Sequence, residues 1–536
     1  MILKKLGGFV IALSAATACV DTDSSLGENL IPDDQAYTFH SYTFELDDIQ
    51  MKQADSLSGY SSYRIVFGAT QDELFGLTRH SSAFYLVPIL DTLDFGDPGT
   101  QVYKNFHISA PFDTLSYSTG GQEHILQNIN VYALNSPMNL DKAIPELDYD
   151  ATVRVSRGIP MYNGKDSLSF DLNAEYGSKY LTITREELDD LDLYLERFPG
   201  IVLSTDDPIG MGGRINMFKL PVDVYSNSIR GSYATLSFSA EYDGERKDSA
   251  FYFYLGPTSK YAMADVTATD VSTYPQVAYN LSEHSSKSLE GNAGDVIYFE
   301  GGRGIKPVIK AGPIKEKLEA EIRRLGGNPG SVVINKASIN LPFEFPDDYE
   351  DMVYYPTTMS PTCRILDAST GKVVFAGITD TSISEENPGS VNRSLCKYAP
   401  DVTHHLQALL RLEDTGTIEN YDIWFLAMAN ETVTTTTTTN SDYADYYQQL
   451  AYNSYYSQMY GGYGYGGYGY NSYDSYYSNY YNYMMMASMA NSTSTTTNAQ
   501  SMMDPNRFYR GILNGPAVQD KSRPSMTVIF AIPVSE

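Results

Sequence analysis

The chain has 536 residues, enough for two or three domains with cores of their own. Its 66 acidic and 37 basic residues give a formal net charge of -29 at neutral pH. A surface of that sign repels phosphate backbones and anionic headgroups, so nucleic-acid binding and electrostatic docking to a membrane are both disfavoured.

Residues 1–18 have the three-part layout of a secretory signal. A basic start is followed by an apolar stretch that is too short for a permanent membrane span, and then by small residues directly before Cys19. A cysteine after such small residues is typical of a lipoprotein cleavage site. We therefore expect Cys19 to become the first residue of the mature chain and to carry the lipid. The alternative is an ordinary signal peptide with an incidental cysteine.

Residues 19–36 form an acidic tether, which contains Asp21, Asp23 and Glu28 and no lysine or arginine. This pattern resembles the export signal of Bacteroidota lipoproteins that reach the cell surface. The resemblance implies a lipid-anchored protein of the outer membrane, exposed at the cell surface. The alternative is a polar tether without an export role.

The rest of the chain is dominated by short segments with a period of two, separated by turns rich in Gly, Pro, Asp and Asn. This pattern predicts a mainly β fold with two β-sandwich-like domains, 37–275 and 290–536, and a few short packing helices. The clearest strand segments are 128–135, 167–172, 232–242, 249–255, 331–344, 421–429 and 525–533.

Two segments have the pattern of a helix. Thr184 and Glu187 have the spacing of a capping box, and apolar residues continue on one face as far as Phe198, before Pro-Gly. A second amphipathic segment, 313–325, ends at Gly-Gly. Both are expected to pack against sheets rather than to form sites.

Once Cys19 is lipidated, Cys363 and Cys396 remain as a pair in an oxidising compartment. A disulfide between them would close a loop of about 33 residues and add roughly 3–4 kcal/mol of stability. The alternative is two unpaired buried thiols. No metal site is expected, because the histidines lack ligand spacing and the pair His404–His405 would point to opposite faces if it lay in a strand.

Residues 432–504 form a low-complexity insertion rich in Thr, Tyr, Gly and Met. Seventeen of the 45 tyrosines lie between Tyr443 and Tyr483, with few aliphatic residues, so a long disordered insertion without a core of its own is expected. The flanking segments 421–429 and 525–533 are predicted to pair as neighbouring antiparallel strands. The insertion is either an adhesive, partner-binding element or an expanded loop without a specific role.

Catalytic signatures are not recognisable in the sequence. The stretch 300–306 lacks the spacing of a phosphate loop, and 210–213 reads as a tight turn before a strand. Paired carboxylates for glycoside hydrolysis stay possible, because the sequence gives no distance between any two acids. The expectation is a protein that is not an enzyme and has no cofactor.

Several phrases of the chain together resemble an uncharacterised β-rich lipoprotein family of the Bacteroidota. The resemblance spans nearly the whole mature chain except the insertion, and it implies a surface-exposed or outer-membrane lipoprotein. It supplies no catalytic residues. The phrases are "FGATQDELFGLTRHSSAFYL" (67–86), "INVYALNSPMNLDKAI" (129–144), "ERFPGIVLST" (196–205), "DVIYFEGGRGIKPVI" (295–309), "VVINKASINLPF" (332–343) and "RPSMTVIF" (523–530).

Two classes of function are open at this point. The first is a non-catalytic accessory or scaffold subunit of an outer-membrane β-barrel complex, for example one that assembles outer-membrane proteins. The second is a glycan-binding surface lipoprotein for nutrient capture, which would need exposed aromatic platforms. Trp424, the only tryptophan, lies in an apolar strand and is expected in the core. A hydrolase is the third possibility and lacks any motif.

Overall fold

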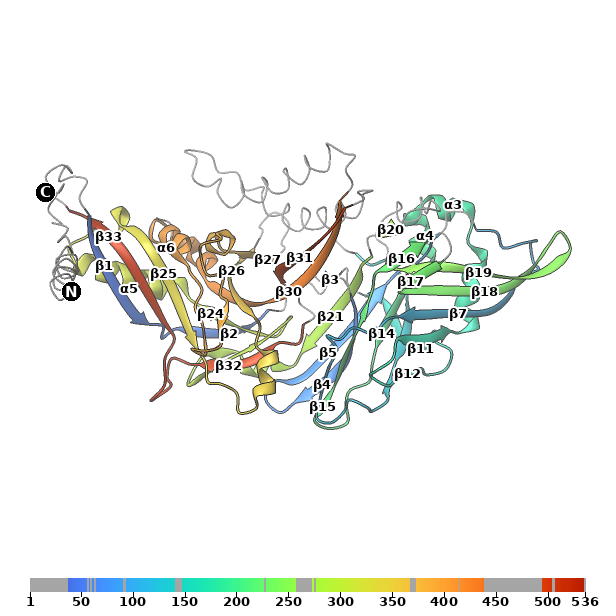
Figure 1. Cartoon of the computed structure of the whole chain (residues 1–536), viewed down its shortest axis with the longest axis horizontal. Coiled ribbons are helices and arrows are strands. Elements are labelled where there is room, and N and C mark those ends of the chain that lie inside the picture. Colours follow the sequence, from blue (N-terminus) through green and yellow to red (C-terminus); the bar gives the residue numbers. More distant parts are fainter. Residues whose placement is uncertain are drawn as a thin grey trace, which may run out of the picture.

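The computed structural model consists of two β-rich halves that lie side by side along the longest axis (Figure 1). Every strand pairing among the described residues is antiparallel, as expected for a mainly β chain. The described ranges are 37–54, 57, 60–61, 64–89, 93–139, 147–225, 228–256, 272–273, 276–366, 373–413, 415–437, 494–503 and 507–534.

The N-terminal half is a sandwich of a nine-stranded and a five-stranded sheet. The larger sheet has the path β11 (Tyr149–Arg154), β10 (Asn130–Leu134), β14 (Ile201–Ser204), β5 (Gly76–Phe84), β4 (Arg64–Asp72), β15 (Gly212–Lys219) and β8 (Tyr117–Thr119), with β21 (Ala278–His284) on β5 and β3 (Tyr60–Ser61) on β21. The smaller sheet has the order β13 (Leu168–Leu172), β7 (Val102–Ala110), β18 (Tyr233–Tyr242), β19 (Glu245–Leu255) and β6 (Leu86–Pro88).

One core joins the two sheets of this half. Phe67 of β4, Phe106 of β7 and Phe253 of β19 are all fully buried in it. Short helices cover its edge: α2 (Ala174–Gly177), η3 (Ser178–Thr182), α3 (Arg185–Asp189) and α4 (Leu191–Arg197). The small sheets add β9 (Gln127–Asn128) with β12 (Met161–Tyr162), and β17 (Ser228–Gly231) with β16 (Val222–Tyr225) and β20 (Ser272–Thr273).

The C-terminal half contains a five-stranded and a seven-stranded sheet. The first has the order β1 (Tyr37–Glu45), β33 (Ser525–Pro533), β25 (Val333–Pro342), β29 (Lys397–Tyr398) and β28 (Val391–Asn392). The second has the order β22 (Gly291–Asn292), β2 (Ile49–Gln53), β24 (Ile305–Ile309), β30 (Ile423–Thr437), β26 (Thr358–Leu366) and β27 (Val373–Gly377), with β31 (Ser494–Met503) on β30.

The core of the C-terminal half lies among these sheets and two helices, α5 (Ala311–Arg324) and α6 (Thr403–Leu410). Leu318 of α5, Val528 of β33 and Phe425 of β30 are fully buried in it. The remaining elements are the strand pair β23 (Val296–Glu300) and β32 (Arg510–Asn514), and the short helices η5 (Ser286–Leu289), η6 (Pro329–Ser331), η7 (Tyr349–Tyr354), η8 (Thr379–Ser382) and η9 (Thr415–Tyr421).

The first two strands belong to the C-terminal half, which differs from the domain boundaries predicted at 37 and 275. β1 pairs with β33 and β2 pairs with β24, whereas β21, beyond residue 275, pairs with β5. The N-terminal sandwich therefore begins after β2 and ends with β21. The sequence pattern marks strands but carries no information on pairing partners so far apart in the chain.

The two predicted helices are present. The capping box is complete: the Glu187 backbone N–H donates to Thr184 Oγ1, and the Thr184 backbone N–H donates to Glu187 Oε2 at 2.7 Å. That segment is divided into α3 and α4 at Asp190, which has an extended backbone and caps α4. The second predicted helix is α5, which begins two residues earlier than expected.

The predicted pairing of 421–429 with 525–533 is wrong. β30 instead pairs with β31, through ten pairs from Met428–Met503 to Thr437–Ser494, and β33 lies in the other sheet. Residues 432–437 and 494–503, at the two ends of the predicted insertion, therefore belong to strands, and Figure 1 shows their ribbon rising away from the rest of the sheet. Residues 438–493 lie outside the described residues.

Candidate functional site

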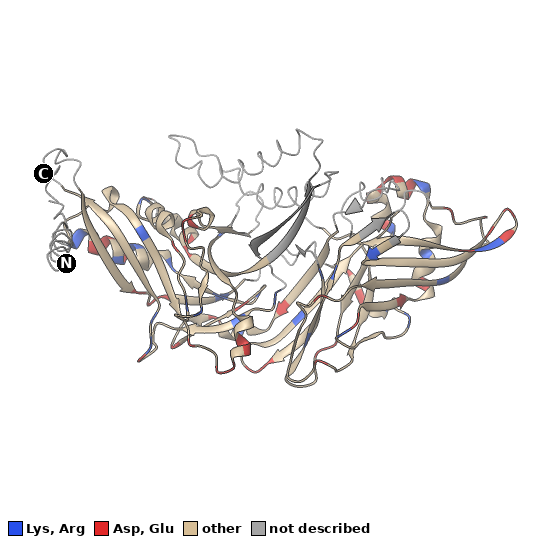
Figure 2. Cartoon of the chain, in the orientation of Figure 1, with Lys and Arg blue, Asp and Glu red and all other residues tan. Residues whose placement is uncertain are grey.

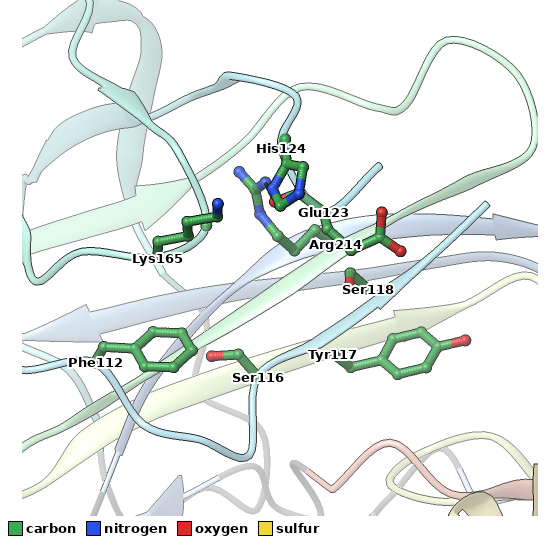
Figure 3. A pocket seen from close by; sticks show the side chains of 9 residues that line it. Phe112, Ser116, Tyr117, Ser118, Glu123, His124, Lys165 and Arg214 are labelled. Carbon is green, nitrogen blue, oxygen red and sulfur yellow. Dashed lines mark hydrogen bonds between the residues drawn. The ribbon is translucent and has the colours of Figure 1, made fainter. Parts of the chain in front are cut away.

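The candidate site is a small pocket at one edge of the N-terminal sandwich, built around Arg214 of β15. The pocket has a volume of about 140 Å³. Three loops surround it, because β15 pairs with β8 and the loops next to β9 and β12 close over the Arg214 side chain. It is lined by Phe112, Ser116, Tyr117, Ser118, Glu123, His124, Gly164, Lys165 and Arg214 (Figure 3).

Arg214 is almost fully buried and binds the surrounding loops through its guanidinium group. Nε donates to Asn216 Oδ1 at 2.8 Å, and Nη2 donates to the Tyr162 carbonyl at 2.8 Å. Nη1 donates to the carbonyls of Gln122 and Glu123, at 3.3 and 3.0 Å. All four acceptors are neutral, so these contacts hold the loops but leave the positive charge uncompensated.

Gly164 allows the loop beside β12 to lie directly on this guanidinium. Its φ of +83° is in the left-handed region, and a Cβ there would lie 2.6 Å from Arg214 Nη1. A larger residue would therefore be strained and would also displace the arginine. The glycine is a local requirement of the pocket.

The electrostatics of the pocket are positive, although the chain is strongly acidic. Among the described residues no carboxylate pairs with Arg214, and its burial lowers the pKa of the guanidinium while the neighbouring Tyr162 opposes that shift. Arginine nevertheless stays charged in proteins. A buried cation without a counter-charge is costly, and a bound anion would reduce that cost.

Two exposed basic side chains stand at the mouth of the pocket. In Figure 3 the Lys165 ammonium and the His124 ring lie on the same side as the Arg214 guanidinium, whereas the Glu123 carboxylate points away from Lys165. Figure 2 shows acidic residues scattered over both halves of the molecule rather than gathered on one face. The pocket is thus a small basic site on an acidic protein.

Ser116, on the opposite wall, is not placed as a nucleophile. Its hydroxyl lies 2.9 Å from the Asp113 carbonyl and 3.2 Å from the Met217 carbonyl, and it accepts the Met217 backbone N–H at 2.9 Å. These contacts use the hydroxyl to join a turn to β15. The arrangement around Arg214 can bind a small anion, and no activated hydroxyl accompanies it at Ser116.

The loops around the pocket also carry exposed apolar side chains, which we call the apolar rim. Gln122 Nε2 donates to the Met211 carbonyl at 2.8 Å, and the Ile129 backbone N–H donates to the Pro160 carbonyl at 2.8 Å, so the three loops are held together. Large apolar groups gathered on a surface mark interaction sites. The rim consists of Ile125, Leu126, Ile159, Met161, Ile209 and Met211, each more than half exposed.

The predicted disulfide is not formed: Cys363 and Cys396 are both free thiols. Cys363 lies in β26 of the seven-stranded sheet, with its sulfur 4.0 Å from His405 Nδ1. Cys396 lies in the turn between β28 and β29 of the other sheet, at a φ of +46°. Because the two cysteines belong to different sheets, the even cysteine count was a misleading guide. Cys19 lies outside the described residues.

The pair His404–His405 lies in the helix α6 and not in a strand. His405 is buried, with Nε2 2.9 Å from the Tyr421 carbonyl, whereas His404 is half exposed beside Asp380. Among the described residues there is no cluster of three or more His, Cys, Asp or Glu that could hold a metal ion.

The sequence prediction of a tight turn at 210–213 does not include Arg214, which lies in the strand after it. The sequence "GGRINMF" (212–218) does indicate an unusual arginine. An arginine at an inward position of an otherwise apolar strand must find buried hydrogen-bond acceptors. Its partners are carbonyls of loops about 50 and 90 residues away, which no local pattern reveals.

No family model, no curated protein and no solved structure matches the chain. No helix in the described part of the chain is long and apolar enough to cross a membrane.

Proposed function

We propose that this chain is a non-catalytic lipoprotein, anchored in the outer membrane through Cys19 and exposed at the cell surface. In this proposal it serves as an accessory or scaffold subunit of an outer-membrane β-barrel complex. The lipid would confine the protein to two dimensions, which raises the effective concentration of any membrane partner.

The observation that supports this proposal is the apolar rim around the Arg214 pocket. Its six large apolar side chains, five on loops and Met161 on β12, are each more than half exposed. Segments that carry them also supply backbone carbonyls to Arg214, a cation that no carboxylate compensates in the described structure. Such a combination suits a contact with a polypeptide better than a contact with a hydroxyl-rich glycan. Trp424 is buried beside Phe375, with ring centroids 5.4 Å apart, so it offers no platform for a sugar.

The test is crosslinking in intact cells, followed by purification of the tagged full-length protein in mild detergent. We expect an outer-membrane β-barrel protein in near-stoichiometric amount. The double variant Leu126→Asp and Met161→Asp should lose that partner, because two charges in the rim would be desolvated on binding. The matched control is Val102→Asp, which puts a charge at a similarly exposed apolar position on β7.

Two other outcomes would contradict the proposal. Recovery of the protein alone, with retention on a polysaccharide column, would favour the glycan-binding function. Equal recovery of the barrel protein with the rim variant would show that the rim is not the contact surface. The anchor is tested separately: Cys19→Ala should release the protein from the membrane fraction after a carbonate wash.

A further inference from the structure

We propose that the Arg214 pocket binds a carboxylate group of a partner polypeptide, while the apolar residues beside that carboxylate lie on the rim. This inference rests on the proposed function and specifies the chemistry of the contact. It uses the pocket and the rim as one site, with a charged centre and an apolar border.

The hydrogen bonds of Arg214 determine what the pocket can offer. A guanidinium has five N–H groups, and four of them have acceptors, namely Asn216, Gln122, Glu123 and Tyr162. One N–H on Nη2 is left for a ligand. The pocket therefore presents a single donor of Arg214 and not the two-pronged fork with which arginine often binds carboxylate or phosphate.

The side chains at the mouth complete a site for one carboxylate. One ligand oxygen would accept the remaining Arg214 N–H, and the other would face the Lys165 ammonium and the His124 ring, which line the same pocket. A doubly charged phosphate is less suited, because Glu123 also lines the pocket and the whole protein carries a net charge of -29. The volume of about 140 Å³ accommodates only a small group.

The apolar rim favours a polypeptide as the rest of the ligand. Ile125 and Leu126 directly follow His124, and Met161 precedes Tyr162, whose carbonyl binds Arg214. A group seated in the pocket thus has exposed apolar side chains within a few residues of its charged contacts. A polypeptide supplies a carboxylate with apolar neighbours either at its C-terminus or at an Asp or Glu side chain.

The experiment uses the full-length protein in detergent and three fluorescent peptides. They are acetyl-Ala-Leu-Ala-Phe with a free C-terminal carboxylate, the same peptide as an amide, and the amide of acetyl-Ala-Leu-Asp-Phe. We expect at least one carboxylate peptide to bind tenfold or more tightly than the neutral amide, by fluorescence anisotropy. The comparison of the first and third peptides tells a chain end from a side chain.

Variants at the mouth separate binding from folding. Lys165→Gln and His124→Gln change exposed side chains, so each should preserve the melting temperature and weaken carboxylate binding several-fold. Lys179→Gln, which removes an exposed lysine beside Tyr176, is the control and should bind like the parent. Arg214→Gln should abolish binding, but because its side chain holds three loops the inference is judged on the other two variants.

Several results would overturn the inference. Equal affinity for the acid and amide peptides would leave the rim as a purely apolar contact, and the proposed function would survive. Displacement of the peptide by inorganic phosphate at lower concentration than by acetate would indicate a general anion site. Binding of an oligogalacturonate but of no peptide would contradict both the inference and the proposed function.

Discussion

Tyr117 and Phe508 stack face to face between the two halves, with ring centroids 3.8 Å apart and ring planes 16° from parallel. Arg510, two residues beyond Phe508, donates from Nη2 to the Tyr117 hydroxyl at 3.0 Å and forms an ion pair with Asp72. Tyr354 meets the Tyr117 ring edge-on at 5.1 Å. Because Tyr117 also lines the Arg214 pocket, the junction and the candidate site share a side chain.

Removing this stack should destabilise the junction. Phe508→Ala deletes a partly buried ring and its aromatic contacts, so we expect a loss of about 2 kcal/mol in the free energy of unfolding. Differential scanning calorimetry should show a lower melting temperature or two resolved transitions. Phe345→Ala removes a more exposed ring and should change stability by less than about 0.5 kcal/mol. An unchanged thermogram for Phe508→Ala would show that the halves are held elsewhere.

His80 should make the fold sensitive to acid. It is buried on β5 beside His284, with Nδ1 unpartnered in the described structure, and burial, followed by His284, lowers the pKa of His80 to about 3. The unfolded chain binds this proton below pH 6.5 and the folded chain does not, so stability is full above pH 6.5 and is lost progressively towards pH 3. Between pH 6.5 and 5 this amounts to about 2 kcal/mol.

The measurement is urea unfolding at pH 6.5 and pH 5 for the parent and for His80→Phe. The variant should lose about 2 kcal/mol less on acidification, and the exposed-site control His124→Gln should behave like the parent. Lys306, buried nearby and hydrogen bonded to the Glu300 carbonyl, has its pKa lowered to about 7 by burial and titrates above this window. The same loss of stability in His80→Phe would refute the assignment.

The two free thiols should differ in reactivity. Burial, followed by Asp422, raises the pKa of Cys363 to about 12, whereas Cys396 lies in a turn with its sulfur 3.5 Å from the Arg393 carbonyl. Because the thiolate is the reactive form, iodoacetamide at pH 8 should label Cys396 in the native protein and Cys363 only after unfolding. Peptide mass mapping measures this. Failure of both to react, with an intact mass two hydrogens lower, would restore the disulfide.

Shortening the insertion should leave the fold intact. Deleting residues 438–493 and joining Thr437 to Ser494 through Asn-Gly keeps every β30–β31 pair and closes the ribbon with a turn suited to a two-residue connection. The closure cost of the hairpin falls by up to roughly 3 kcal/mol. We expect a melting temperature no lower than that of the parent. A variant that fails to fold would show that the deleted tyrosines and methionines contribute to a core.

The sequence predicts the faces of strands better than their partners. The alternation in 525–533 correctly indicates buried Met526, Val528 and Phe530, because a period of two depends only on local geometry. The pairing of β33 with β1 and β25, rather than with β30, depends on residues far apart in the chain. The capping box at Thr184 was predictable for the same reason that the strand faces were: both partners lie within one turn of the chain.

The sequence could indicate a buried arginine in β15, but not the pocket around it, for a related reason. Its positive centre is one arginine, Arg214. The neutral carbonyls of Glu123 and Tyr162, which lie far from it in the sequence, bind the guanidinium without compensating its charge. A lone arginine in a strand has no motif. The prediction of a disulfide failed for a different reason, because a count of cysteines does not show in which sheet each cysteine lies.

The pairing of β1 with β33 also determines the order in which the two halves can fold. The N-terminal sandwich draws its core from residues 65–279 and can form once they are made. β1 must wait for a partner about 480 residues later in the chain, and the sandwich can be complete before that partner is present. Until β33 is present, β1 has no partner strand, and its aromatic side chains Tyr42 and Phe44 are not packed in a sheet. The first strand of the described chain is therefore completed last, and until then its apolar face is open to wrong partners.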